Sequence, residues 1–201
     1  MPSKLKNSQI TAILLAAGGS SRLGQPKQIL HYKNGVLINY ILKQIKNGGI
    51  SKIKIVLGSH YELIKSQITF NDVEFLNNHE WEEGISSSIR CGLFHLNPEK
   101  PAAMFFVVDQ PYLDSKIIQK IIMKFKTSKA KIIATKVAGQ ITHPVLFRHE
   151  LFPKLRELRG DVGGKAVFKD SILETVDWDD ERLLIDIDSI EDYKEIIRRD
   201  I

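Results

Sequence analysis

The chain has 201 residues, of which 43% are hydrophobic and 26% are charged, a composition typical of one globular domain with a sizeable core. Its apolar runs fall well short of the roughly 20 residues that cross a bilayer, and the single cysteine, Cys91, excludes an internal disulfide and a cysteine-rich zinc site. With one cysteine in the chain, we expect a location in the reducing cytoplasm. The net charge of +5 favours an anionic ligand, whereas the dispersed lysines disfavour nucleic acid.

Strand and helix patterns alternate along the chain. Apolar runs predict strands at 10–17, 52–57, 73–76, 102–108 and 131–136, and apolar residues at helical spacing predict helices at 36–47, 61–68 and 115–125. This alternation predicts an α/β fold with a mostly parallel sheet, right-handed crossovers and helices on both faces, in a single domain over 1–201. Ligands of such sheets bind beyond the carboxyl ends of the strands.

The first strand leads into a glycine-rich loop that reads GGSSRLGQPK over 18–27. Gly18 and Gly19 let backbone N–H groups face a bound anion without Cβ crowding. Arg22 and Lys27 add two positive charges of different shape, a combination suited to a polyphosphate. The loop therefore predicts a binding site for a nucleoside triphosphate.

Three other interpretations of this stretch fit its residues less well than a triphosphate-binding loop. A Walker loop requires Gly-Lys-Ser/Thr, but Gly24 is followed by Gln25 and Pro26. The glycines do not supply the G-x-G-x-x-G dinucleotide pattern. A secretory signal peptide is the remaining alternative, because lysines precede the apolar run, although that run is near the short limit for such segments.

Carboxylates follow two later apolar segments. Asp109 ends the run AAMFFVV, where it could hold Mg²⁺ over the phosphates or merely form a turn before Pro111. Asp186 and Asp188 would share one face of a strand, because alternate residues point the same way. One of them is expected to complete the metal site, while Asp188 or Ser189 could instead cap the helix that follows. We slightly favour Asp186 as the metal ligand.

Six segments resemble motifs of the MobA-like nucleotidyltransferases, and specifically of their molybdenum cofactor cytidylyltransferase branch. The segments follow one another along the chain in the same order as the motifs of that family. LLAAGGSSRLGQPKQIL resembles L-A-A-G-x-S-x-R-x-G-x-x-K, and VVDQPYLD resembles the D-Q-P segment. NNHEWEEGISSSIRCG resembles N-x-x-W-x-x-G-x-x-x-S. GQITHPVLF resembles G-x-x-G-H-P-V-L-F, with Thr142 in place of Gly. LRGDVGGKAVF resembles G-D-x-G-A-R, with Gly164 and Lys165 in place of Ala and Arg. LLIDIDSIEDY resembles D-I-D-T-P-E-D-Y, with Ile190 in place of Pro.

The resemblance implies a Rossmann-like nucleotidyltransferase (GT-A-like) fold and the Mg²⁺-dependent transfer of CMP from CTP to molybdopterin, with pyrophosphate leaving. The implied catalytic residues are Arg22, Lys27 and Asp109. The implied nucleotide-binding residues are Ala16, Ala17, Gly18, Gly19, Ser20, Arg22, Lys27, Gly84 and Ser88. The implied acceptor-binding residues are His143, Asp161 and Lys165, and the implied metal ligands are Asp109, Asp186 and Asp188.

Several alternatives stay open at this level. His143 could be structural, Asp161 could cap a helix, and we expect Trp81 to be a core residue. The acceptor could be another phosphorylated compound, such as a sugar phosphate, and GTP could replace CTP. A different class is a non-catalytic maturation factor that binds nucleotide or cofactor for a partner molybdoenzyme.

Overall fold

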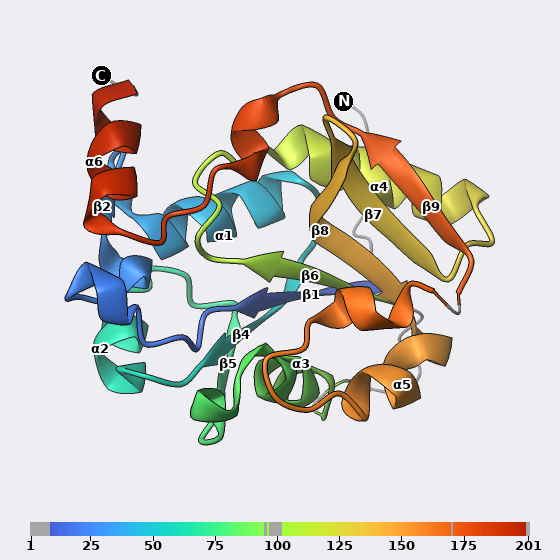
Figure 1. Ribbon diagram of the computed structural model, residues 1–201, viewed down its shortest axis with the longest axis horizontal. Coiled ribbons are helices and arrows are strands. Elements are labelled where there is room, and N and C mark those ends of the chain that lie inside the picture. The colour runs from blue at the N-terminus through green and yellow to red at the C-terminus, as the bar shows by residue number, and fades with distance from the viewer. Residues whose placement is uncertain (1–8, 95, 97–101, 170, 200–201) are drawn as a thin grey trace.

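The structure is a computed structural model that describes residues 9–94, 96, 102–169 and 171–199. Its centre is a seven-stranded sheet in the order β5-β4-β1-β6-β8-β7-β9 (Figure 1). The strands of this sheet are β1 (Ile10–Leu15), β4 (Lys52–Leu57), β5 (Glu74–Asn77), β6 (Ala102–Val107), β7 (Ile132–Val137), β8 (Gln140–Arg148) and β9 (Leu173–Asp177). A small hairpin joins β2 (His31–Tyr32) to β3 (Gly35–Val36).

Helices cover both faces of the sheet. On one face lie α1 (Leu37–Asn47) and α4 (Ser115–Thr127), and on the other lie α3 (Ile85–Phe94) and α5 (Phe152–Arg156) (Figure 1). The two remaining helices are α2 (Tyr61–Ser66) and α6 (Ile190–Arg199). This arrangement explains the continuous apolar run of β1, whose alternate residues enter two separate cores.

The prediction of a mostly parallel sheet with helices on both faces is confirmed. β1 pairs in parallel with β4 and β6, β4 with β5, and β7 with β9. The exception is β8, which runs antiparallel to both β6 and β7. The sequence predicts the strand at 131–136, which is β7, but assigns no strand to 140–148 or to 173–177, so β8 and β9 on either side of it were missed.

One predicted strand is wrong. The segment that carries Asp186 and Asp188 follows a short 3-10 turn at Glu181–Leu184 and has no strand pairing. Its backbone is instead attached to the end of β6 by a single hydrogen bond, in which Ile187 N–H donates to the Asp109 carbonyl at 2.9 Å. That bond brings the acidic segment to the carboxyl edge of the sheet. In the described part of the chain, no helix is both long and apolar enough to span a membrane.

Candidate active site

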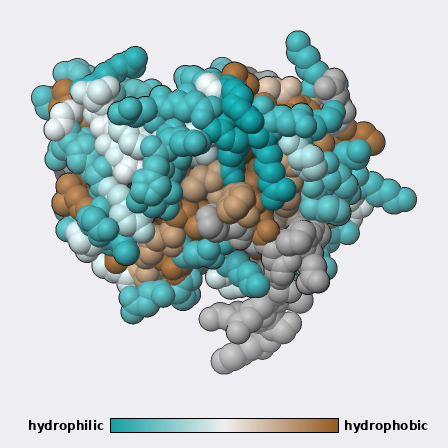
Figure 2. Space-filling view, turned by 90° about the horizontal axis from the view of Figure 1, so that it is seen from below, coloured by the Kyte–Doolittle hydropathy of each residue, from teal (hydrophilic) through white to brown (hydrophobic). Residues whose placement is uncertain are grey.

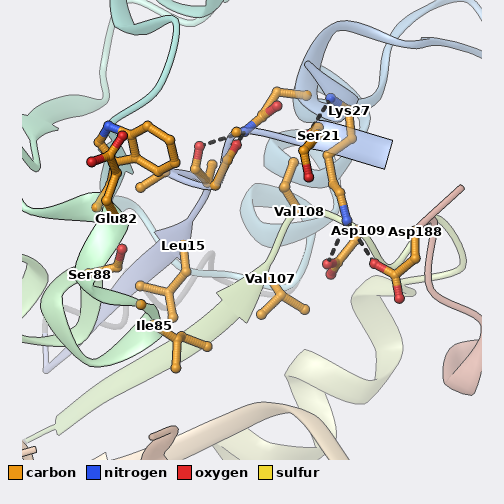
Figure 3. Close-up of a pocket in the computed structure, with 18 of the residues that line it drawn as sticks. Leu15, Ser21, Lys27, Glu82, Ile85, Ser88, Val107, Val108, Asp109 and Asp188 are labelled. Carbon is orange, nitrogen blue, oxygen red and sulfur yellow. Dashed lines mark hydrogen bonds and ion pairs between the residues drawn. The ribbon is translucent and has the colours of Figure 1, made fainter. Parts of the chain in front are cut away.

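A cleft of about 630 Å³ opens at the carboxyl edge of β1 and β6 (Figure 3). It lies between the glycine-rich loop, the start of α3 and the acidic segment before α6. Its lining consists of Leu15–Arg22, Lys27, Gln28, Trp81, Glu82, Gly84, Ile85, Ser88, Val107–Asp109, Asp161 and Asp188. The cleft thus brings together all nine nucleotide-binding residues that the sequence predicted.

Backbone N–H groups of the glycine-rich loop are available for an anion. The backbone N–H groups of Ala17, Gly18 and Gly19 donate no hydrogen bond to any residue within the described ranges. All three residues line the cleft. The carbonyls of the loop, in contrast, are occupied: Ala17 O accepts from Ser59 N at 3.0 Å. Successive free N–H groups of this kind form an anion-binding concavity.

Gln28 fixes the orientation of this loop. Its side chain is 1% exposed, and its Nε2 donates to Ala16 O at 2.7 Å and to Gly18 O at 3.1 Å. Since the C=O and N–H of a planar trans peptide point in opposite directions, these bonds turn the N–H groups of Ala17 and Gly19 away from Gln28. Sequence reasoning missed this residue; the available signal was a glutamine directly after Lys27 inside the recognised motif.

Trp81 packs against the same loop and lines the cleft, so it is more than a core anchor. A Cβ added to Gly19 would lie 3.1 Å from the Trp81 ring. The glycine therefore allows the indole to approach the loop backbone closely. On the other side of the loop, Ser20 adopts a left-handed conformation (φ 53°), and its Oγ accepts from Lys27 N at 3.0 Å.

Lys27 lies between two carboxylates at the floor of the cleft (Figure 3). Its Nζ is 3.2 Å from Asp109 Oδ2 and 3.1 Å from Asp188 Oδ1. The Lys27 side chain is only 14% exposed, so its charge is poorly screened by solvent. Arg22 is different: it is exposed, lines the cleft and forms no hydrogen bond or ion pair with another described residue.

The carboxylate pair fits a divalent cation whose remaining ligands come from elsewhere. In the described residues, no group of three or more His, Cys, Asp and Glu side chains is arranged to hold a metal. Asp109 and Asp188 nevertheless converge on one cation, the Lys27 ammonium. Mg²⁺ is commonly bound by one or two carboxylates together with substrate phosphates and water, so two protein ligands beside a phosphate-binding loop suit it.

Asp186 lies outside the lining of the cleft, whereas Asp188 belongs to it. Asp186 remains electrostatically linked to the site, because desolvation by the surrounding protein and the charge of Asp109 raise its pKa to about 6. Asp188 N and Ser189 N both donate to Asp192 Oδ2, and Ser189 Oγ accepts from Asp192 N at 3.2 Å, so Ser189 and Asp192 together stabilise the start of α6. The Asp188 carboxylate is therefore free to bind Lys27.

The start of α3 is covered by the loop around Gly160. Ser86 Oγ donates to Gly160 O at 2.6 Å, and Ile85 N donates to Asp161 Oδ1 at 3.4 Å. Ser88 Oγ accepts from Asn78 Nδ2 at 3.1 Å, which leaves its hydroxyl hydrogen available to a ligand in the cleft. Asp161 thus accepts from the start of the helix and also lines the cleft, and its binding of an acceptor stays a prediction.

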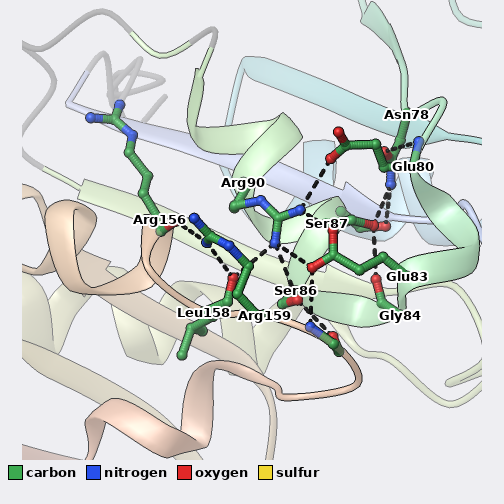
Figure 4. A network of polar contacts seen from close by, with 12 residues as sticks. Asn78, Glu80, Glu83, Gly84, Ser86, Ser87, Arg90, Arg156, Leu158 and Arg159 are labelled. Carbon is green, nitrogen blue, oxygen red and sulfur yellow. Dashed lines mark hydrogen bonds and ion pairs between the residues drawn. The ribbon is translucent and has the colours of Figure 1, made fainter.

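A charged network fastens this loop to α3 (Figure 4). Arg90 pairs with Glu83 and with Glu80, and its Nη1 donates to Leu158 O at 2.8 Å. Glu83 Oε1 in turn accepts from Gly160 N at 3.1 Å. The Arg90 side chain and the Gly160 N–H lower the pKa of Glu83 to about 2. The Arg90–Glu83 ion pair therefore binds the backbone of this loop at two positions, Leu158 and Gly160.

His143 and Lys165 lie together in a second, smaller pocket beside the cleft. Burial, together with the positive charge of Lys165, lowers the pKa of His143 to about 4, so its imidazole is neutral at pH 7. Neither side chain forms a hydrogen bond or ion pair with another residue in the ranges described. The three predicted acceptor residues are therefore divided: Asp161 lines the cleft, and the other two line the adjacent pocket.

A mostly parallel α/β sheet with a free N–H loop, two cations and two carboxylates at its carboxyl edge defines a phosphate-binding enzyme scaffold. The comparisons with known proteins agree: residues 12–176 match the family described as the MobA-like NTP transferase domain, and the chain belongs to that family. It is an enzyme of the nucleotidyltransferase class.

Individual relatives cover nearly the whole chain. Nicotine blue oxidoreductase of Paenarthrobacter nicotinovorans is 25% identical over 191 residues, which cover 90% of this chain and 93% of that protein. The crystal structure of Rv0371c from Mycobacterium tuberculosis H37Rv is similar at a TM-score of 0.84 and 25% identity, covering 95% of this chain and 99% of that one. Rv0371c has also been solved in complex with manganese. Molybdopterin-guanine dinucleotide biosynthesis protein A from Archaeoglobus fulgidus shares the fold, with a TM-score of 0.70 at 14% identity over 95% of this chain and all of that one.

Proposed function

We propose that the protein transfers CMP from CTP to a phosphorylated small-molecule acceptor, with molybdopterin as the first candidate, and releases pyrophosphate. The observation that carries this proposal is the Lys27 ammonium between Asp109 and Asp188, next to a loop with three free N–H groups. Cations and donors suited to a triphosphate thus lie beside carboxylates suited to a divalent metal. That combination is what phosphoryl-type transfer requires of a protein.

The chemistry needs no protein nucleophile. An oxygen of the acceptor phosphate attacks the α-phosphorus of CTP, the new O–P bond forms, and the bond between the α- and β-phosphates breaks as pyrophosphate leaves. The N–H groups of Ala17, Gly18 and Gly19, with Arg22 and Lys27, would hold the phosphates in line. Ser88 would donate its hydroxyl hydrogen to the nucleoside. Mg²⁺, when bound by Asp109 and Asp188, would neutralise charge on the triphosphate and on the departing pyrophosphate.

The nucleotide is tested by a thermal-shift panel of CTP, GTP, ATP and UTP, each with Mg²⁺. A ligand that binds only the folded state raises the melting temperature by mass action. We expect CTP to give the largest shift; a larger shift with GTP would correct the nucleotide, and no shift with any nucleotide would refute the proposal.

Turnover is tested by pyrophosphate release from CTP in the presence of a phosphorylated acceptor. A maturation factor that only carries nucleotide or cofactor would bind CTP without releasing pyrophosphate. This readout is needed because one relative, nicotine blue oxidoreductase, is named for a different reaction.

A further inference from the structure

The pocket that holds His143 is separate from the cleft but directly adjoins it. It has a volume of about 170 Å³, and Leu15 and Ile85 line both cavities. Its walls come from α3, β6, β8 and the segment after Gly163. Leu15 and Ile85 therefore form the boundary that the two cavities share, and a ligand in the cleft lies next to this pocket.

The walls of this pocket are almost entirely apolar. Phe105 and Phe147 meet edge to face with ring centroids 5.7 Å apart, and Phe168 lies 6.1 Å from Phe147. Ile89 and Leu155 add aliphatic surface. An apolar cavity of about 150 Å³ stays dry and binds a benzene ring, and aromatic side chains favour further rings in offset or edge-on contact. The size and lining therefore suit one uncharged ring.

Two polar side chains limit what can accompany that ring. Lys165 is exposed, so its ammonium can meet an anionic group of the ligand where the pocket reaches the surface. His143 is neutral and offers one donor and one acceptor, with no charge to repel an apolar group. A cationic substituent on the ring would meet the like charge of Lys165 and no opposite charge in the lining of the pocket.

We propose that the acceptor presents one uncharged ring to this pocket, between Ile89, Phe147 and Phe168, and carries an anionic group that Lys165 binds. This inference rests on the proposed nucleotidyl transfer, because it makes the pocket the place where the acceptor, rather than the nucleotide, is selected. On the face of the molecule seen in Figure 2, hydrophilic side chains predominate and the apolar areas between them are smaller.

The test compares benzyl phosphate with ethyl phosphate, which have the same charge but differ in the ring. Isothermal titration should show that benzyl phosphate binds the full chain at least tenfold more tightly. Gly163→Leu should abolish this preference by filling the pocket. A side chain fits at this position, because φ is −81° and an added Cβ would have only Ile85 Cγ2 near it, at 4.0 Å.

Gly35→Leu is the matched control. Gly35 also has open space around an added Cβ, but it lies on β3, outside both cavities, so this variant should keep the preference for benzyl phosphate. If Gly163→Leu does not fold, Ile89→Phe fills the same pocket from α3. Lys165→Gln should weaken both phosphates alike and leave the ratio between them unchanged.

The outcomes separate this inference from the proposed function. Equal affinity of the two phosphates for the unmodified protein, or an unchanged preference in a folded pocket-filling variant, would overturn the ring site. If the melting temperature still rises with CTP and Mg²⁺ in that case, the nucleotide site stands and only the inference fails. A clear preference for benzyl phosphate without any response to nucleotides would support the ring site and refute the nucleotidyl transfer.

Discussion

Gly84 joins the short turn at Trp81–Glu83 to α3, and replacing it with alanine tests how tightly the loop around Gly160 is docked. Gly84 has φ 114° and ψ −173°, a conformation that is essentially restricted to glycine. A Cβ there would lie 2.7 Å from Gly160 O and 2.8 Å from both Asp161 N and Asp161 Cα. These are backbone atoms, so the overlap cannot be relieved by rotating a side chain.

The expected cost of Gly84→Ala combines two effects. Holding a non-glycine residue in this conformation costs about 1–3 kcal/mol. Moving the loop to relieve the overlap weakens the hydrogen bond between Ser86 Oγ and Gly160 O, whose loss costs about 0.5–1.5 kcal/mol. Together they lower the free energy of unfolding by about 2–4 kcal/mol, which corresponds to a fall of about 1–2 M in the urea midpoint for a slope near 2 kcal/mol per M.

Gly163→Ala is the control for this measurement. Its φ of −81° suits any residue, and the nearest atom to an added Cβ is 4.0 Å away. Such a change should leave stability unaltered or raise it by about 0.4–1 kcal/mol, because it restricts the unfolded chain. Urea titrations of both variants decide the matter: a midpoint for Gly84→Ala equal to that of Gly163→Ala would show that the described loop contact is wrong.

Three further changes test the cleft and its neighbour. Asp109→Asn should lower the rate of pyrophosphate release at saturating Mg²⁺ by about 100-fold or more with an unchanged circular dichroism spectrum; turnover like that of the unmodified protein would remove Asp109 from the mechanism. Gln28→Leu should raise the KM for the nucleotide by about tenfold, which corresponds to about 1.4 kcal/mol, because the loop loses two hydrogen bonds. An unchanged KM would contradict the positioning role of Gln28. The pKa of His143 is 6.5 in the unfolded chain and about 4 in the folded one. As the pH falls, the unfolded state therefore takes up the proton first. The free energy of unfolding then decreases by at most about 3 kcal/mol between pH 6.5 and pH 4. Melting temperatures of His143→Gln should depend less on pH over that range, and equal slopes would show that His143 does not titrate as described.

Features set by neighbouring residues could be predicted from the sequence. The glycine-rich loop and the acidic residue at the end of β6 are local: a buried apolar run followed by these residues already defines a strand and its carboxyl end. Features that depend on distant contacts could not. The antiparallel β8 follows a two-residue turn after β7, yet its pairing with β6 depends on the whole sheet.

The choice between Asp186 and Asp188 shows the same limit at the level of single side chains. A strand would put both carboxylates on one face, and the sequence pattern offers no way to separate them. The segment is not a strand, because its backbone hydrogen bond goes from Ile187 to the Asp109 carbonyl and not to a neighbouring ladder. Only the resulting path of the chain decides that Asp188 reaches Lys27 while Asp186 stays outside the cleft.

The charge balance at the floor of the cleft links the metal to the nucleotide. Asp109 and Asp188 carry two negative charges, and Lys27 neutralises only one of them, so an unaccompanied triphosphate would approach a site with residual negative charge. A divalent cation bound between the carboxylates would make the local charge positive. It would also release the Lys27 ammonium, because the carboxylate oxygens that bind Lys27 would then bind the metal. Nucleotide and metal are therefore expected to bind as a pair, with Lys27 turning from the carboxylates to the phosphates. In the structure, the Lys27 ammonium stabilises the carboxylate pair through these two ion pairs.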